Sequence, residues 1–135
     1  MEIVLSHSSP VPLYSQLHQQ IVAAIASGRL APGTALHSVR TMALEFGINP
    51  ATVKKAYDQL AAEGLVVTRP RAGTVVAERS AFTPEQANAV EKVVASAFTL
   101  GRAQGATHAQ LEEIAHRALD AESNFGAAAV KETTC

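Results

Sequence analysis

The sequence has little cysteine, few aromatic residues and almost no net charge. Its only cysteine is Cys135, the last of 135 residues, so neither an internal disulfide nor a paired-cysteine metal site can form. Tryptophan is absent and aromatic residues make up 4% of the chain, so aliphatic side chains must supply the core. The chain is also too short for a TIM barrel, which takes about 250 residues. We therefore expect one ordinary domain or two small ones.

Neither a membrane span nor a secretory leader is expected from this sequence. The longest apolar stretch, residues 93–100, is far shorter than the roughly 20 residues that span a bilayer. The chain begins without a basic region and is interrupted early by Pro10 and Pro12, unlike a secretory signal. The sequence therefore predicts a soluble, cytoplasmic protein that makes no membrane contact.

The sequence contains no pattern typical of an active site. No nucleophile–base pair and no phosphate-binding GxxxxGK motif can be found. The five histidines are not grouped with carboxylates at metal-ligand spacing, which favours surface or capping roles for them. We expect neither an enzyme nor a bound cofactor or metal.

The charge is unevenly distributed along the chain, although the formal net charge is only −1. Residues 1–80 contain seven basic and five acidic residues, whereas residues 81–135 contain four basic and seven acidic residues. This balance is not that of a general polyanion binder. Any contact with nucleic acid must come from locally clustered cations in the first half.

Helix and turn signals in the first half predict a helix-turn-helix. Apolar residues spaced by four indicate a helix over residues 13–27. Ser38 is a suitable N-cap for a short helix that ends at Gly47. Asn49, followed by proline, then starts a helix that Gly64 closes. Two helices joined by a tight turn form a helix-turn-helix.

A hairpin and two further helices are expected after these elements. The β-prone runs 65–69 and 74–77 flank a turn, which predicts a wing. Thr83 and Thr107 each begin a capping box, and the two helices that they open are expected to end near Gly105 and residue 122. The fold class is therefore mainly α with a small β wing. The expected domains are a winged helix-turn-helix DNA-binding domain (1–80), a helical dimerisation domain (81–122) and a flexible tail (123–135).

The two C-terminal helices cannot bury their apolar faces alone, because chains below about 40 residues rarely fold without outside help. Their partner is either the winged domain or the same pair of helices from a second chain. A four-helix association across a two-fold axis satisfies the pattern with the least strain.

The first half resembles the DNA-binding domain of the GntR family of bacterial transcription regulators. The matching runs are residues 12–17 (PLYSQL), 25–36 (IASGRLAPGTAL), 38–43 (SVRTMA), 49–57 (NPATVKKAY), 60–66 (LAAEGLV) and 73–76 (GTVV). Residues 99–113 (TLGRAQGATHAQLEE) are similar to the small YtrA-type subgroup of this family. The resemblance implies a winged helix-turn-helix and a pair of C-terminal helices used for homodimerisation.

The candidate DNA-binding residues lie in the predicted helix-turn-helix and wing. A helix in the major groove shows polar groups on its first turns, and its N-terminus adds backbone N–H groups and partial positive charge toward phosphate. The resemblance implies that Arg40, Thr52 and Lys54 face the groove. The residues that cap the two helices can also contact phosphate. The candidates are Ser38, Arg40, Thr41, Asn49, Thr52, Lys54, Lys55, Arg71 and Gly73.

Alternatives remain for several of these residues. Lys54 and Lys55 suit a solvated helix face, and Arg40 suits a surface pair with Glu45. Two positions also depart from the family pattern: His37 stands where proline is usual, and Arg71 stands at the first glycine of the wing. Because glycine permits a positive φ there, the conformation of the wing tip is left open.

The resemblance implies a homodimeric, sequence-specific repressor bound to a pseudo-palindromic operator in double-stranded DNA. The alternative is a protein-interaction adaptor whose winged head does not bind DNA, which the weak net charge and altered wing would suit. A tail of this size leaves little room for a ligand pocket of about 300–1,000 Å³ unless the dimer interface provides one. A small-molecule effector is therefore left open.

Overall fold

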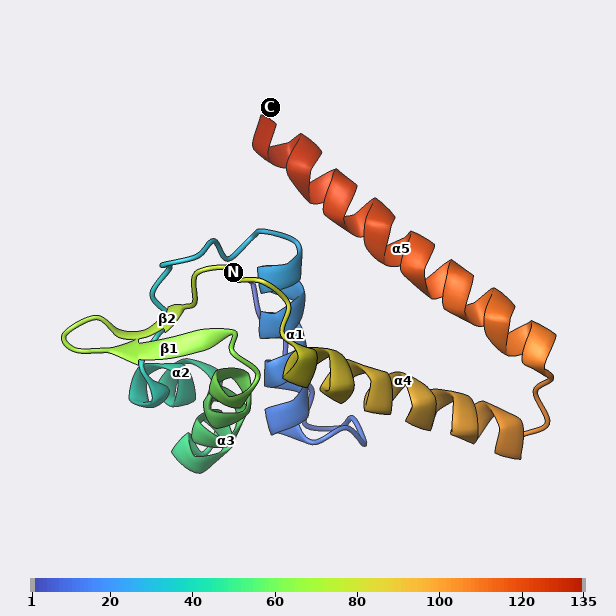
Figure 1. Ribbon diagram of the computed structural model, residues 1–135. Coiled ribbons are helices and arrows are strands. Elements are labelled where there is room, and N and C mark those ends of the chain that lie inside the picture. The colour runs from blue at the N-terminus through green and yellow to red at the C-terminus, as the bar shows by residue number, and fades with distance from the viewer. Residues whose placement is uncertain (1, 135) are drawn as a thin grey trace. The chain divides into compact units, whose positions relative to one another are not determined.

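The computed structural model describes the backbone of residues 2–134 and the side chains of residues 2–122. It forms two units, Met1–Arg79 and Ser80–Cys135. The elements, in chain order, are α1 (Leu13–Ala26), α2 (Val39–Phe46), α3 (Pro50–Ala62), β1 (Val66–Arg69), β2 (Gly73–Val76), α4 (Pro84–Ala103) and α5 (His108–Thr134) (Figure 1). The expected fold class, mainly α with a small β wing, is confirmed.

The ends of α2 and α3 are set by local side-chain chemistry. Ser38 caps α2 by accepting a hydrogen bond from the Thr41 backbone N–H at 3.1 Å. Gly47 ends α2 with a φ of 63°, a conformation that costs other residues free energy. Asn49 caps α3, and Pro50 is its first residue. These predictions from the sequence are confirmed.

The first unit has an aliphatic core between its three helices. Helix α3 packs against both α1 and α2. The largest fully buried side chains are Leu17, Ile21, Met42, Val53 and Leu60. Each contributes about 1.5–3 kcal/mol of transfer free energy relative to exposure. This core fixes the position of α3, whose other face stays in solvent.

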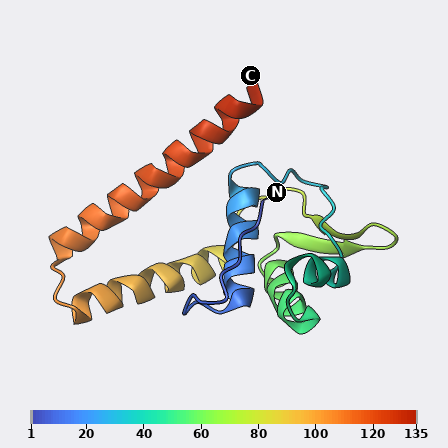
Figure 2. The same ribbon diagram turned by 180° about the vertical axis from the view of Figure 1, so that it is seen from behind.

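The wing is a two-stranded antiparallel hairpin with an additional extended segment beside it. Val66 pairs with Val76 and Arg69 with Gly73. Ala35 forms an isolated bridge with Val75, and the Leu36 N–H donates to the Thr74 carbonyl at 2.9 Å. The chain just before α2 therefore runs along β2, as both ribbon views show (Figures 1 and 2). The sequence did not predict this pairing.

The second unit consists of α4 and α5. The predicted capping boxes are present, with reciprocal hydrogen bonds between Thr83 and Gln86 and between Thr107 and Gln110. Helix α5 continues to Thr134, so the end expected near residue 122 was wrong. Alanine-rich sequence at 127–129 favours helix even without an amphipathic pattern. The flexibility of residues 123–135 stays a prediction, and their side chains lie outside the described part.

Within the described residues, no helix combines the length and the apolar character that a bilayer span requires.

Candidate nucleic-acid interface

Helix α3 separates a polar face from a buried one. Asn49, Lys54 and Lys55 are exposed, and Thr52 is half-buried. The opposite face is closed against the core and consists of Val53, Ala56, Tyr57 and Leu60. The helix can therefore present its first turns to another molecule without exposing its apolar side chains.

The backbone N–H groups at the start of α3 are already paired. Pro50 has no N–H, and the Ala51 N–H donates to Asn49 Oδ1 at 2.8 Å. The N–H groups of Thr52 and Val53 both donate to the Asn49 carbonyl, at 2.9 and 3.4 Å. These N–H groups are therefore bonded within the chain itself, and contact between this terminus and phosphate stays a prediction. The helix dipole and the side chains remain available.

The two lysines of α3 have different surroundings. Lys54 Nζ lies 2.6 Å from Asp58 Oδ2, and both side chains are about two-thirds exposed, at 69% and 65%. Lys55 Nζ lies 3.7 Å from the ring centroid of Tyr14 on α1, a cation–π contact. Lys54 is thus held by an exposed ion pair worth about 0–1 kcal/mol, which phosphate can displace. Lys55 also helps to join α3 to α1.

Arg40, on the first turn of α2, is exposed and has no ion pair among the described residues. The alternative partner, Glu45, instead places its carboxylate 3.9 Å from His37 Nε2. Next to Arg40, the Ser38 hydroxyl donates to Thr41 Oγ1 at 2.9 Å. The Thr41 hydroxyl proton is therefore left to donate elsewhere.

Tyr57 connects the polar end of α2 to α3. Its hydroxyl donates to the His37 carbonyl at 2.7 Å, and only 5% of the residue is exposed. Burial raises the pKa of Tyr57 to about 12, so the hydroxyl stays a neutral donor at physiological pH. No sequence pattern predicted this hydrogen bond, which joins residues 20 positions apart in the chain.

The wing tip contains a strained arginine. Arg69, Arg71 and Gly73 are all exposed. Arg71 has a φ of 69°, and it is the only non-glycine residue with a positive φ in the described part of the chain. The next glycine, Gly73, has a φ of 72°. Arg71 therefore adopts the conformation that the family pattern assigns to a glycine.

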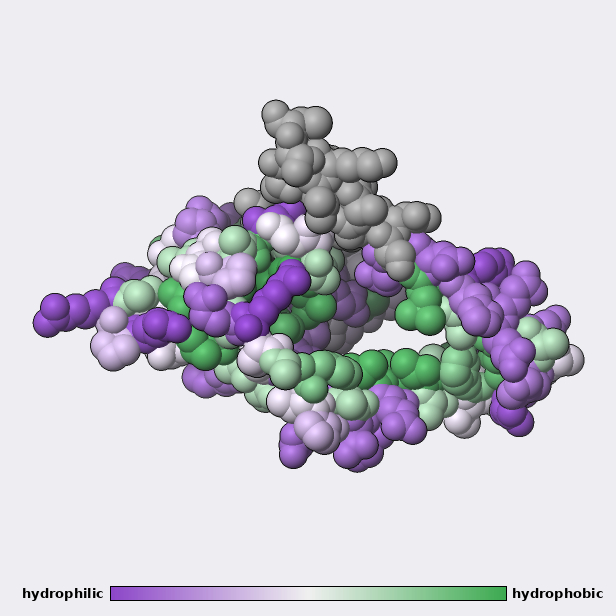
Figure 3. Space-filling view, turned by 45° about the horizontal axis from the view of Figure 1, so that its top comes forward, coloured by the Kyte–Doolittle hydropathy of each residue, from purple (hydrophilic) through white to green (hydrophobic). Residues whose placement is uncertain are grey.

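The second unit leaves much of its apolar surface uncovered. Helix α4 has no buried residue, and Leu111 is the one buried side chain described in this unit. Hydrophobic side chains are visible along α4 in Figure 3. The large exposed apolar residues of the two helices are Val90, Val93, Val94, Leu100, Ile114 and Leu119.

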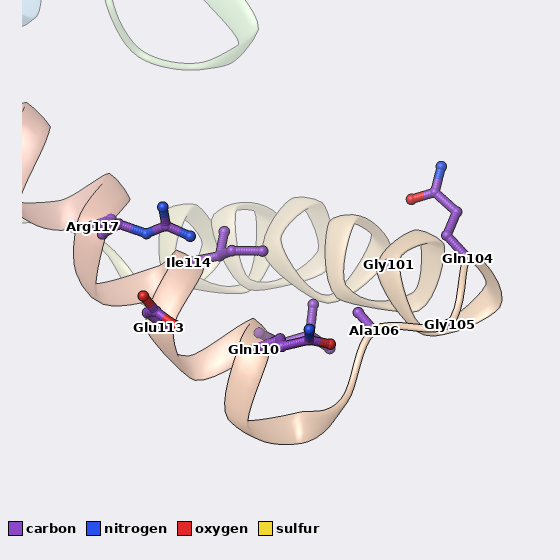
Figure 4. Close-up of a pocket in the computed structure, with 9 residues that line it drawn as sticks. Gly101, Gln104, Gly105, Ala106, Gln110, Glu113, Ile114 and Arg117 are labelled. Carbon is purple, nitrogen blue, oxygen red and sulfur yellow. The ribbon is translucent and has the colours of Figure 1, made fainter.

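An open hollow of about 520 Å³ lies at the turn between α4 and α5 (Figure 4). Its lining includes Gly101 from α4, and Leu111 and Ile114 from α5, with Glu113 and Arg117 also around it. A Cβ atom on Gly101 would lie 2.8 Å from Leu111 Cδ2, so the two helices approach closely at this point. Ile114, which lines the hollow, is also one of the large exposed apolar residues of this unit.

The first unit is a winged helix-turn-helix DNA-binding domain: three helices around an aliphatic core, with α3 exposed on one face and a hairpin after it. Residues 13–76 match the family model described as bacterial regulatory proteins, gntR family. The chain belongs to this family. It is a transcription regulator rather than an enzyme.

Named relatives agree with this assignment. The chain is 36% identical over 90 residues to the transcriptional regulator Rv1152 of Mycobacterium tuberculosis, covering 67% of the chain and 74% of Rv1152. It is 37% identical over 81 residues to the repressor YtrA of Bacillus subtilis, covering 60% and 62%. It is 41% identical over 69 residues to the regulator YdeL of Bacillus subtilis, covering 51% of the chain but only 15% of YdeL.

A solved structure is similar over both units. It is YtrA from Sulfolobus acidocaldarius, a GntR-family transcription factor, with a TM-score of 0.61 and 29% identity. The match covers 87% of this chain and 97% of that protein. The expected resemblance to the YtrA-type subgroup is therefore supported by sequence and by fold.

Proposed function

We propose that this protein is a cytoplasmic repressor that binds a pseudo-palindromic DNA operator as a homodimer. The observation that carries the proposal is the exposed polar end of α3 together with Arg40 on α2, which forms no ion pair with any residue that the structure describes. A helix of this kind fits the major groove of B-DNA, which is about 12 Å wide. The core and the Tyr57 hydrogen bond hold α2 and α3 in one arrangement.

The nine candidate residues divide by chemistry into base-reading and phosphate-binding groups. Arg40 reads guanine through two parallel hydrogen bonds, the commonest specific arginine contact. Thr52 and Lys54 face base edges or the adjoining phosphates from the first turns of α3. Ser38, Thr41, Asn49 and Lys55 position the backbone of the duplex. Arg71 and Gly73 bring the wing tip against the DNA.

The second unit supplies the dimer contact in this proposal. Val93 and Leu100 are 71% and 60% exposed, and Ile114 and Leu119 are 46% and 67% exposed. On α4, Val90, Val93, Val94 and Leu100 fall on one side at helical spacing. Such a face in a pair of helices is typical of a four-helix association between two copies.

A dimer of this kind places two winged heads on successive major grooves, about 34–36 Å apart. The operator is then a pseudo-palindrome, because the two-fold axis of the protein is matched by the DNA. Repression follows when the bound dimer occludes the promoter. The designation of the relative YtrA as a repressor supports this sign of regulation.

Selection from a pool of randomised duplexes tests DNA recognition. The purified full chain should enrich an inverted repeat, and its affinity should fall steeply as salt rises because phosphate contacts release counterions. A folded protein that enriches no motif would instead favour the interaction-adaptor alternative.

A separate experiment tests whether the protein represses or activates transcription. If it is a repressor, deletion of the gene should raise expression from a promoter that contains the operator. Lower expression would mean activation.

A further inference from the structure

The apex of the wing consists of three residues between the paired strand ends. Arg69 pairs with Gly73, so Pro70, Arg71 and Ala72 form the turn. Arg71 is the middle residue and has a φ of 69°. Left-handed backbone is unfavourable for a side chain that is neither glycine nor asparagine. Arg71 therefore occupies the apex at a cost to folding.

Nothing in the described part of the fold offsets this cost. Arg71 is exposed and takes part in no hydrogen bond, ion pair or ring contact among the described residues. A Cβ atom on the neighbouring Gly73 would meet nothing within 4 Å, so the turn is also open around it. A strained, exposed and unpartnered cation is typical of a residue that acts on a ligand.

The shape of the apex restricts what that ligand can be. The residues on either side of Arg71 are Pro70 and Ala72, which have no polar side chain and little bulk. The turn extends away from the three helices, and the end of the hairpin is strongly hydrophilic (Figures 1 and 3). The tip is therefore narrow and ends in a single guanidinium group.

A narrow tip with one guanidinium is complementary to the minor groove of DNA. That groove is about 6 Å wide, and at runs of A·T pairs it narrows further and becomes more negative, which attracts inserted arginine. Arg69 is the last residue of β1 and lies outside the three-residue turn. Resting on the proposed DNA binding, we propose that Arg71 inserts into the minor groove flanking each half-site and selects A·T pairs there.

The test uses the operator obtained by selection, with the flank next to each half-site made either of A·T or of G·C pairs. The full-length protein should bind the A·T-flanked operator about tenfold more tightly, within the range for one misread position. Arg71→Gly should reduce this preference to about twofold or less, because the guanidinium is gone. Arg71→Lys should keep only part of it, because a lysine is more strongly hydrated and less suited to a narrow groove.

Arg69→Ala is the matched control. It removes one cation from the same hairpin but leaves the apex unchanged, so it should weaken binding to both operators by the same factor. Thermal unfolding supplies a second readout. Arg71→Gly relieves the strain at φ 69° and should melt no lower than the unaltered protein, which separates a loss of recognition from a loss of folding.

Two results would overturn the inference. If Arg71→Gly weakens binding equally on both flanks, the arginine contacts phosphate and reads no groove. If the substitution changes neither affinity, the tip does not touch DNA. Both outcomes leave the enriched inverted repeat intact, whereas failure of the proposed function would appear earlier as the absence of any enriched motif.

Discussion

At the residue scale, Arg40 differs from the cations of α3 because nothing in the described part of the protein restrains its charge. Lys54 is paired with Asp58, and Lys55 lies over Tyr14. Arg40→Ala should therefore cost about 1–3 kcal/mol at the operator and relax the base preference at one position. Titration of labelled operator and of random duplex measures this. An equal loss on both duplexes would make Arg40 a phosphate contact.

Asp58 competes with DNA for Lys54, since the two charged atoms are 2.6 Å apart on an exposed face. Asp58→Asn should raise DNA affinity about two- to fivefold, because an exposed pair of about 0.5 kcal/mol is lost and one repulsive charge is removed. The same substitution in a Lys54→Ala background should have a smaller effect. Equal effects in both backgrounds would show that Asp58 does not act through Lys54.

Tyr57 gives the first unit a pH dependence at the alkaline end. Its pKa is raised from 10.0 to about 12, so the folded state holds the phenolic proton more tightly than the unfolded state. The stability that depends on this proton is complete below pH 10 and is lost as the pH rises toward 12. The free energy of unfolding should fall by up to about 2 kcal/mol over that interval. Chemical denaturation at several pH values measures it.

Tyr57→Phe is the control for this titration. It should cost about 1 kcal/mol at neutral pH, because the hydrogen bond to the His37 carbonyl is lost. The alkaline decline should then be smaller. If the variant declines as steeply as the unaltered protein, another group is responsible.

At the scale of the element, the turn between α2 and α3 depends on Gly47. Its φ is 63°, and a Cβ atom there would meet nothing within 4 Å, so the cost of a substitution is conformational rather than steric. Gly47→Ala should destabilise the protein by about 1 kcal/mol. Gly47→Asn should cost less, because asparagine tolerates left-handed backbone. Equal costs in thermal unfolding would contradict this explanation.

The sequence predicted those elements whose ends depend on local chemistry. Ser38, Asn49 and the capping box at Thr83 are short-range signals, and each was found where it was expected. Pairing between distant segments was missed, as in the bridge from Ala35 to Val75. The end of α5 was also misplaced, because helical propensity without an amphipathic pattern gave no visible signal.

The candidate interface shows the same division between local and distant contacts. The family resemblance implied that Arg40 faces the groove, and the structure shows Arg40 exposed. The ion pair between Lys54 and Asp58 has a spacing of four residues, which a search for such pairs would have found. The position of Lys55 over Tyr14 depends on how α1 packs against α3, which no local pattern encodes.

At the scale of the whole molecule, the exposed apolar side of α4 is the basis for expecting a dimer. Val93 is 71% exposed, so a charge there should be tolerated in a monomer but not in a packed helix interface. Val93→Asp should lower the association constant of the dimer at least tenfold, as measured by sedimentation equilibrium. Glu91→Asp, a conservative change on α4, should leave it intact. An unaltered association constant for Val93→Asp would place the dimer contact elsewhere.

The most direct test of the proposed operator reading is the affinity of the full chain for its selected operator with and without five base pairs inserted between the half-sites. Two heads held at a fixed separation engage both half-sites only when these lie on one face of the duplex. The insertion should therefore reduce affinity about 100-fold or more, to that of a single half-site. Equal affinity for the two duplexes would contradict a dimer that reads both half-sites together.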